Sequence, residues 1–236
     1  LYLDGFAPKS PRALMQFLMI PRNGLAEFEA WEGDYAAILA WIESLEAPKW
    51  PWDVDVALAE RGHVAFNRVC AECHGTYGAR GEYPERIVSI DEVGTDRVRF
   101  DALDVAAHKR YSDSWFTKDT RVKTILEPAG YVAPPLDGIW ASAPYFHNGS
   151  VPTLWHVLHT DQRPRVWRRT QDGYDQEKVG LEATTFDEMP ADAISPDERR
   201  RVFDTRAFSK SAAGHRFVDR LTEDEKTAVL EYLKTL

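Results

Sequence analysis

Cys70-Ala71-Glu72-Cys73-His74 is the stretch of this sequence that determines how the rest of the chain is interpreted. Two cysteines separated by two residues and followed directly by histidine form the attachment signature of a c-type haem. The thiols can bond to the haem vinyl groups, and the adjoining imidazole is then held beside the ring with one nitrogen free to bind iron. The motif therefore predicts one haem c, attached covalently through Cys70 and Cys73, with His74 as an axial ligand.

Other uses of a cysteine pair find little support in the sequence. A structural zinc site needs four ligands and usually more cysteine, whereas these are the only two cysteines among 236 residues. A thioredoxin-like redox pair would follow a strand in an alternating pattern of strands and helices, but the residues ahead of Cys70 predict a helix. Covalent haem is the interpretation that agrees with both the motif and its surroundings.

A helix is predicted to run into the motif, because five residues recur at three- and four-residue steps and so share one helical face. They are Leu58, Gly62, Phe66, Val69 and Cys73. Gly62 is unusual there, since an interior glycine costs a helix about 1 kcal/mol relative to alanine. Such a glycine marks a place where another backbone or a large ring comes close.

The candidate partner of this helix lies at the other end of the chain. Thr222 to Glu225 form a capping box, and a final helix with an apolar stripe follows it. Tyr232 on that helix is the predicted neighbour of Gly62. The pairing of a Gly-x-x-x-Phe-x-x-x-Cys helix with a terminal Tyr-Leu helix resembles the class I cytochrome c fold, in which the two helices cross beside the haem.

This resemblance implies a mainly α protein, in which a class I cytochrome c-like helical domain carries a long loop-rich insertion and follows an N-terminal helical segment. The expected boundaries are 53–236 for the domain, with the insertion at about 76–213, and 1–52 for the N-terminal segment. Apolar residues at helical spacing predict two helices in that segment. Its end is similar in pattern to the terminal helix, so we interpret it as the tail of a preceding cytochrome domain.

The same resemblance implies a second axial ligand shortly before the last helix, where class I cytochromes carry methionine. Gly214-His215 stands in that place here, so His215 is expected to bind iron opposite His74. Two imidazole ligands generally give a lower reduction potential than a His/Met pair, because methionine favours the reduced iron. The alternatives are His159, Met189 and an open sixth position.

A proline-rich stretch within the insertion resembles a wider group of haem proteins. Residues 132–154 contain the phrase Ala-Pro-Tyr-Phe-His-Asn-Gly, in which the tyrosine is Tyr145 and the histidine is His147. The stretch is similar to a loop beside the carboxy-terminal haem in the di-haem cytochrome c peroxidase and MauG superfamily, especially in rubber-oxygenase-like cytochromes. The resemblance implies that Tyr145 and His147 help to bind the haem. Ser150 is expected to cap a helix that starts at Val151.

Charge and composition limit the partners and the location. The formal net charge of −9 disfavours nucleic acid and anionic membranes as partners, so a basic redox protein or an upstream haem domain is expected. The apolar run 14–20 is too short to span a bilayer, and no transmembrane segment is expected. Covalent haem predicts a periplasmic or otherwise exported protein, although no signal peptide is recognisable.

Three functions agree with these features. An electron carrier with one haem is favoured, since both axial positions have a candidate ligand and iron can cycle between its ferric and ferrous states. The second is a haem peroxidase or oxygenase, in which the iron has an open position and His147 manages protons. Because those enzymes hold two haems and this chain has one attachment motif, the chain could instead be the relay half of such an enzyme. The third is a gas-sensing or structural module.

One basic run stands out in the otherwise acidic chain. Four arginines and a tryptophan lie within residues 163–169. Such a run most often forms a solvated face. Its functional interpretation is a set of cations that neutralise haem propionates or dock an acidic partner.

Overall fold

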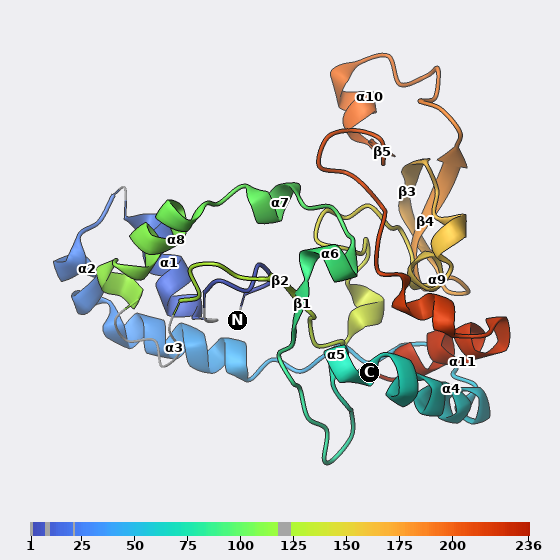
Figure 1. Cartoon of the computed structure of the whole chain (residues 1–236), viewed down its shortest axis with the longest axis horizontal. Helices are drawn as coiled ribbons and strands as arrows, with labels where there is room; N and C mark the ends of the chain where they lie inside the picture. The colour runs from blue at the N-terminus through green and yellow to red at the C-terminus, as the bar shows by residue number, and fades with distance from the viewer. Residues whose placement is uncertain (1, 8–9, 21, 118–123) are drawn as a thin grey trace.

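The computed structural model describes residues 2–7, 10–20, 22–117 and 124–236. Helices make up 43% of the structure and strands 12%, and the strands form two antiparallel sheets (Figure 1). The architecture is therefore mixed α and β, and the expectation of a mainly α protein is wrong. The reason lies in the insertion, where alternating and β-branched sequence forms a three-stranded sheet in a region that was expected to be loops.

Two helices cross at the carboxy-terminal side of the molecule. They are α4 (Val56–Val69) and α11 (Glu223–Leu233). A Cβ atom on Gly62 would lie 1.9 Å from the carbonyl oxygen of Ala228 and 2.9 Å from Cβ of Tyr232, so only glycine allows this approach. The predicted contact between Gly62 and Tyr232 is confirmed, as is the capping box of Thr222 and Glu225 at the start of α11.

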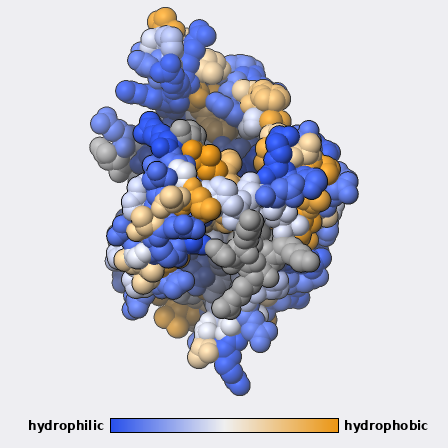
Figure 2. All heavy atoms as spheres, turned by 90° about the vertical axis from the view of Figure 1, so that its left-hand side faces the viewer, coloured by the Kyte–Doolittle hydropathy of each residue, from blue (hydrophilic) through white to orange (hydrophobic). Residues whose placement is uncertain are grey.

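The N-terminal segment contains three helices. These are α1 (Pro11–Met19), α2 (Leu25–Ala30) and α3 (Glu32–Glu43). Phe28 is buried between them, and its ring lies 5.2 Å from that of Trp115 in the short helix η1 (Trp115–Thr117), which follows α8 (Val105–Ser112). The segment therefore packs on part of the insertion. Large apolar side chains of α1 and α3 remain exposed, and Figure 2 shows hydrophobic patches interrupted by hydrophilic residues on this side.

A small sheet lies between the N-terminal helices and the crossing helices in Figure 1. It pairs β1 (Ile87–Ser89) with β2 (Gly130–Val132), and Val88 is opposite Tyr131. The short helices α6 (Ile90–Val93) and α7 (Val98–Asp101) follow β1. The sheet is tied to the start of the chain because the backbone N–H of Val132 donates to the carbonyl oxygen of Leu3 at 2.7 Å.

The second sheet has the strand order β4-β3-β5 and projects from the upper right of Figure 1. Its strands are β3 (Val166–Asp175), β4 (Gly180–Phe186) and β5 (Val202–Asp204), and α10 (Pro196–Arg200) lies before β5. Trp167 stacks on Phe203 with ring centres 5.3 Å apart. The basic run therefore forms part of a sheet.

Three further short helices lie between β2 and β3, and a fourth lies between β5 and α11. They are η2 (Ile139–Ala141), α9 (Leu154–Leu158), η3 (Thr160–Gln162) and η4 (Arg216–Arg220). Helix α9 starts later than expected. Thr153 caps it by accepting from the backbone N–H of His156, while Ser150 is buried and Val151 bridges to Tyr145. The expectation that Ser150 caps a helix from Val151 is therefore wrong. In the described parts of the chain, no helix has the length and apolar character needed to cross a bilayer.

Candidate functional site

The two cysteines and His74 lie on one helical turn, α5 (Ala71–His74), directly after α4. The backbone N–H groups of Cys73 and His74 donate to the carbonyl oxygen of Cys70 at 3.1 and 3.0 Å. Gly75 ends the turn with a φ of 86°, and a Cβ atom there would lie 2.4 Å from the carbonyl oxygen of Glu82. The turn thus gathers both thiols and one imidazole, as thioether attachment beside an axial histidine requires.

The environment of the thiols does not activate them. Both cysteines are free and partly buried. Burial raises the pKa of Cys70 to about 12 and also raises the pKa of Cys73. Both residues are therefore thiols rather than thiolates near pH 7 in this environment.

The imidazole of His74 is oriented by the loop after β2. Its Nδ1 lies 2.8 Å from the carbonyl oxygen of Pro134. A carbonyl only accepts, so Nδ1 carries the proton and Nε2 keeps a free lone pair. Metal-binding histidines are commonly oriented in this way. The hydroxyl of Tyr77 adds a second link, since it donates to the His74 carbonyl at 3.0 Å and accepts from the Leu136 N–H at 2.6 Å.

His215 faces His74 across the site. The centres of the two imidazole rings are 6.1 Å apart, and their planes are inclined by 59°. His215 has left-handed backbone geometry, with φ 53° and ψ 45°. Its Nδ1 is buried and makes no hydrogen bond with any described residue. Desolvation lowers the pKa of His215 to about 3 and also lowers that of His74, so both imidazoles are neutral near pH 7, the form that binds metal.

The spacing of the two imidazoles fits a single metal ion between them. An imidazole nitrogen bound to a metal lies about 2.0–2.1 Å from it, which places the centres of two opposing rings about 6 Å apart. Within the described ranges, no group of three or more His, Cys, Asp or Glu side chains could hold a metal ion. The described structure therefore brings two imidazoles, and no larger set of metal-binding side chains, to this place.

Aromatic rings surround the imidazole of His215. The ring centres of Phe146 and Phe217 are 5.9 and 5.8 Å from that of His215. Such rings form a wall of low polarity. They suit a bound haem edge, and they explain why the unpartnered nitrogen of His215 is shielded from water.

The other two candidates for the sixth ligand are placed differently. His159 has both ring nitrogens engaged, with Nδ1 2.8 Å from the Trp155 carbonyl and Nε2 3.1 Å from a carboxylate oxygen of Glu223. Met189 lies exposed in the loop after β4. Of the three residues, His215 is the one that the described structure brings against His74.

Tyr145 holds the loop in which it lies. Its hydroxyl is 3.1 and 3.3 Å from the carbonyl oxygens of Ile139 and Trp140, and burial raises its pKa. Its backbone forms an antiparallel bridge with Val151. The phenol is thus directed at backbone carbonyls, and haem binding by Tyr145 stays a prediction.

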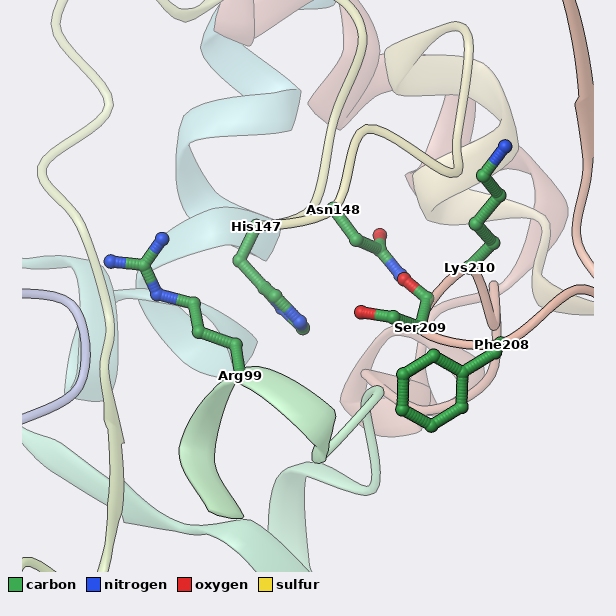
Figure 3. Close-up of a pocket in the computed structure, with 6 residues that line it drawn as sticks. All are labelled: Arg99, His147, Asn148, Phe208, Ser209 and Lys210. Atoms are coloured by element: carbon green, nitrogen blue, oxygen red, sulfur yellow. The ribbon is translucent and has the colours of Figure 1, made fainter. Parts of the chain in front are cut away.

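His147 lies at the wall of a shallow depression. Its ring centre is 4.7 Å from that of Tyr131, and its Nε2 is buried without a hydrogen-bond partner among the described residues. Burial lowers its pKa. The depression has a volume of about 380 Å³ and is lined by Arg99, His147, Asn148, Phe208, Ser209 and Lys210. Figure 3 shows the ring of His147 directed into it. An unpaired imidazole nitrogen at such a wall can accept a proton or a small ligand. Haem binding by His147 likewise stays a prediction.

The basic run does not present its cations together. Arg163 is partly buried and donates to four backbone carbonyls, two of which belong to Ala212 and Gly214 beside His215. Arg168 donates to a carboxylate oxygen of Asp192 at 2.9 Å. Both charges are therefore used within the chain.

Sequence reasoning missed the groups that contact the two histidines or the backbone beside them. They are Tyr77, Pro134, Phe146, Arg163 and Phe217. Most are distant in sequence from the histidine they serve, so no local pattern marks them. The adjoining glycine at position 214 was a usable signal, since glycine before a candidate ligand indicates a backbone under tight constraint.

Comparisons with known proteins connect this site with cytochromes. A sequence-family model described as RoxA-like, cytochrome c-like, matches residues 130–168. That range includes Pro134, Tyr145, His147 and Arg163. The chain thus contains a cytochrome c-like region, which supports haem and iron as its cofactor.

Two curated relatives come from Sinorhizobium fredii (strain NBRC 101917 / NGR234). The uncharacterized protein y4iM is 29% identical over 236 residues, which cover 83% of this chain and 52% of the relative. The uncharacterized protein y4iJ is 27% identical over 258 residues, which cover 81% of this chain and 41% of the relative. The chain spans about half the length of the curated relatives it matches.

Proposed function

We propose that this chain is a c-type cytochrome unit that carries one haem, bound covalently through Cys70 and Cys73, and transfers single electrons. The observation that carries the proposal is the opposition of His74 and His215, whose ring centres are 6.1 Å apart. Both axial positions then have a ligand. A haem with both positions filled is suited to electron transfer, because no site is open for a substrate.

The bound haem would supply the one-electron chemistry of its iron. The chain's own contribution is to fix the two imidazoles. Pro134 keeps the proton of His74 on Nδ1, and Tyr77 ties the backbone of that histidine to the loop at Leu136. Aromatic rings shield His215. Fixed ligands in a dry surrounding limit reorganisation when the charge of the site changes, and two imidazoles favour a low reduction potential.

The wider setting is also a proposal. The net charge of −9 suits a basic redox partner or a haem domain elsewhere in the full-length protein. We place the cytochrome unit at 53–236 and propose that 1–52 links it to a preceding domain. Relatives of about twice this length are consistent with that organisation. Covalent haem attachment would place the protein in an exported compartment.

A haem peroxidase or oxygenase is the second candidate, and the depression at His147 favours it. Its unpaired Nε2 could manage protons for a substrate. This function requires that His215 leave the sixth position or that another haem unit perform the reaction, in which case this chain would be the relay.

Mass spectrometry and spectroscopy of the purified protein test the main proposal. The peptide that contains Cys70 and Cys73 is expected to carry one haem, and the ferric protein should be low-spin and six-coordinate. His215→Ala should convert it to a high-spin form, whereas His159→Ala should not. An unmodified peptide, or a spectrum that His215→Ala leaves unchanged, would overturn the proposed ligation. A high-spin parent protein that turns over hydrogen peroxide would favour the second candidate.

A further inference from the structure

The loop that carries His215 depends on contacts with distant parts of the chain. Residues 210–215 are not helix or strand, and His215 itself has a positive φ, which is uncommon for a residue with a side chain. Left-handed geometry persists only where the surrounding structure enforces it. The contacts that enforce this geometry therefore also determine whether the imidazole of His215 points at His74.

Arg163 holds this loop from one side. Its Nη1 donates to the carbonyl oxygens of Ala212 and Gly214, both at 2.7 Å. Its Nε and Nη2 donate to the carbonyls of His156 and Val157 at 3.0 and 3.2 Å. One guanidinium thus joins the loop before His215 to helix α9.

The same guanidinium also contacts the aromatic wall. Its central carbon lies 4.8 Å from the ring centre of Phe146, and that ring is 5.9 Å from the imidazole of His215. A planar cation over an aromatic face is a favourable arrangement. Arg163 therefore fixes both the backbone of the loop and a side chain that packs beside the imidazole.

The end of helix α6 holds the loop from the other side. The backbone N–H of His215 donates to the carbonyl oxygen of Val93 at 2.6 Å. Gly214 approaches Gly94 so closely that a Cβ atom on it would lie 2.3 Å from the carbonyl carbon of Gly94. The loop is therefore held between a rigid backbone contact and the fork of Arg163.

We propose that Arg163 is a positioning residue that keeps His215 opposite His74. The proposal rests on the proposed function, in which both histidines bind one haem iron. The fork geometry is essential, because a lysine ammonium is a point charge and cannot reproduce a planar set of donors to four carbonyls. In this role Arg163 would orient His215 through its loop, as Pro134 orients the ring of His74.

Ligand exchange with added imidazole measures this role directly. The holoprotein and the variants Arg163→Ala and Arg163→Lys are titrated with imidazole while the spin state of the ferric haem is followed. In the parent protein His215 should exclude the added ligand. In both variants part of the haem should become high-spin, and imidazole should bind at a concentration about tenfold lower, since apparent affinity follows the fraction of open sites. Arg165→Ala is the matched control, since the Arg165 side chain is 61% exposed, and it should behave like the parent.

A second variant approaches the loop from the opposite side. Gly214→Ala places a methyl group against Gly94, which should displace the loop and produce the same gain of imidazole binding. This variant leaves Arg163 intact. If Arg163→Ala fails to fold, Arg163→Lys and Gly214→Ala decide the question.

The outcomes separate the inference from the proposed function. If His215→Ala leaves the spectrum unchanged, the proposed bis-histidine ligation is wrong, and this role of Arg163 is overturned with it. If His215→Ala becomes high-spin while the Arg163 variants that fold stay low-spin and resist imidazole, the positioning role is overturned and the ligation stands. A loss of thermal stability in Arg163→Lys without imidazole binding would likewise overturn the positioning role, because it shows an effect on folding alone.

Discussion

Individual histidines in this protein are set apart by what their ring nitrogens contact. His74 is oriented by a carbonyl, His159 has both nitrogens engaged, and His215 has a nitrogen without a partner. His156 is buried, and its Nδ1 lies 2.7 Å from the hydroxyl of Thr153. The state of each nitrogen, rather than the presence of histidine, decides which residue is available to a metal.

The burial of His156 has a consequence for stability in acid. Desolvation lowers its pKa from the ordinary value of 6.5 to about 4. As the pH falls, the unfolded chain therefore binds a proton at this histidine before the folded chain does. The stability that neutral His156 provides is present above pH 6.5 and is lost as the pH falls towards 4. Within this pH range, one proton bound by the unfolded chain and not by the folded chain lowers the free energy of unfolding by about 1.4 kcal/mol for each pH unit of acidification.

Denaturant unfolding across this pH range measures the contribution of His156. We expect His156→Gln to reduce the slope of unfolding free energy against pH by up to the contribution of one proton. Equal slopes for the parent and His156→Gln would show that this side chain is protonated without loss of the fold.

The crossing of α4 and α11 is the element on which the cytochrome unit depends. Its closest point is Gly62 against Ala228, and Phe66 packs edge-on to Tyr232 with ring centres 5.2 Å apart. Arg220 adds a link, since its Nη2 donates to the carbonyl oxygen of Val69 at 3.3 Å. The turn with Cys70 and Cys73 follows α4 directly, so the crossing helps to fix the position of Cys70.

Alanine at Gly62 tests the crossing. The added methyl group meets backbone on the facing helix, and overpacking of this kind costs about 1–3 kcal/mol, which exceeds the gain of about 1 kcal/mol in helix propensity. We expect a net loss of unfolding free energy in chemical denaturation. Gly33→Ala in α3 is the control, because nothing lies within 4 Å of its added Cβ, and it should be neutral or slightly stabilising. A stabilised Gly62→Ala protein would show that the helices can separate at no cost.

These elements also show how far the sequence could lead. The capping box at Thr222 and the glycine at 62 are local signals, and each gave a correct expectation. The sheet was missed because β3 contains several charged residues and β5 is only three residues long. Several residues that contact His74 or the loop of His215 belong to parts of the chain distant in sequence. No local sequence pattern indicates that these parts come together in the fold.

At the scale of the whole molecule, the N-terminal segment and the insertion depend on each other. Phe28 packs on Trp115, and the backbone N–H of Ile125 donates to the carbonyl oxygen of Phe6 at 2.6 Å. The indole N–H of Trp140 donates to the carbonyl oxygen of Pro48 at 2.8 Å. Residues 1–52 therefore cover part of the chain that was expected to be an insertion in the cytochrome unit.

Removal of residues 1–52 tests this dependence. The shortened chain would expose the rings of Trp115 and Phe116, which the N-terminal helices partly cover. We expect a lower midpoint of thermal unfolding and faster proteolysis within 98–117, while the haem spectrum is retained. An unchanged midpoint would show that the segment does not stabilise the rest of the chain.

The crossing at Gly62 joins positions more than one hundred and fifty residues apart in the chain, since its partners follow Glu223. Helix α4 can pack against α11 only after α11 has been synthesised. If haem is attached at the turn of Cys70 and Cys73 as proposed above, the order of the chain gives its attachment a period before this crossing forms, after which Cys70 is partly buried.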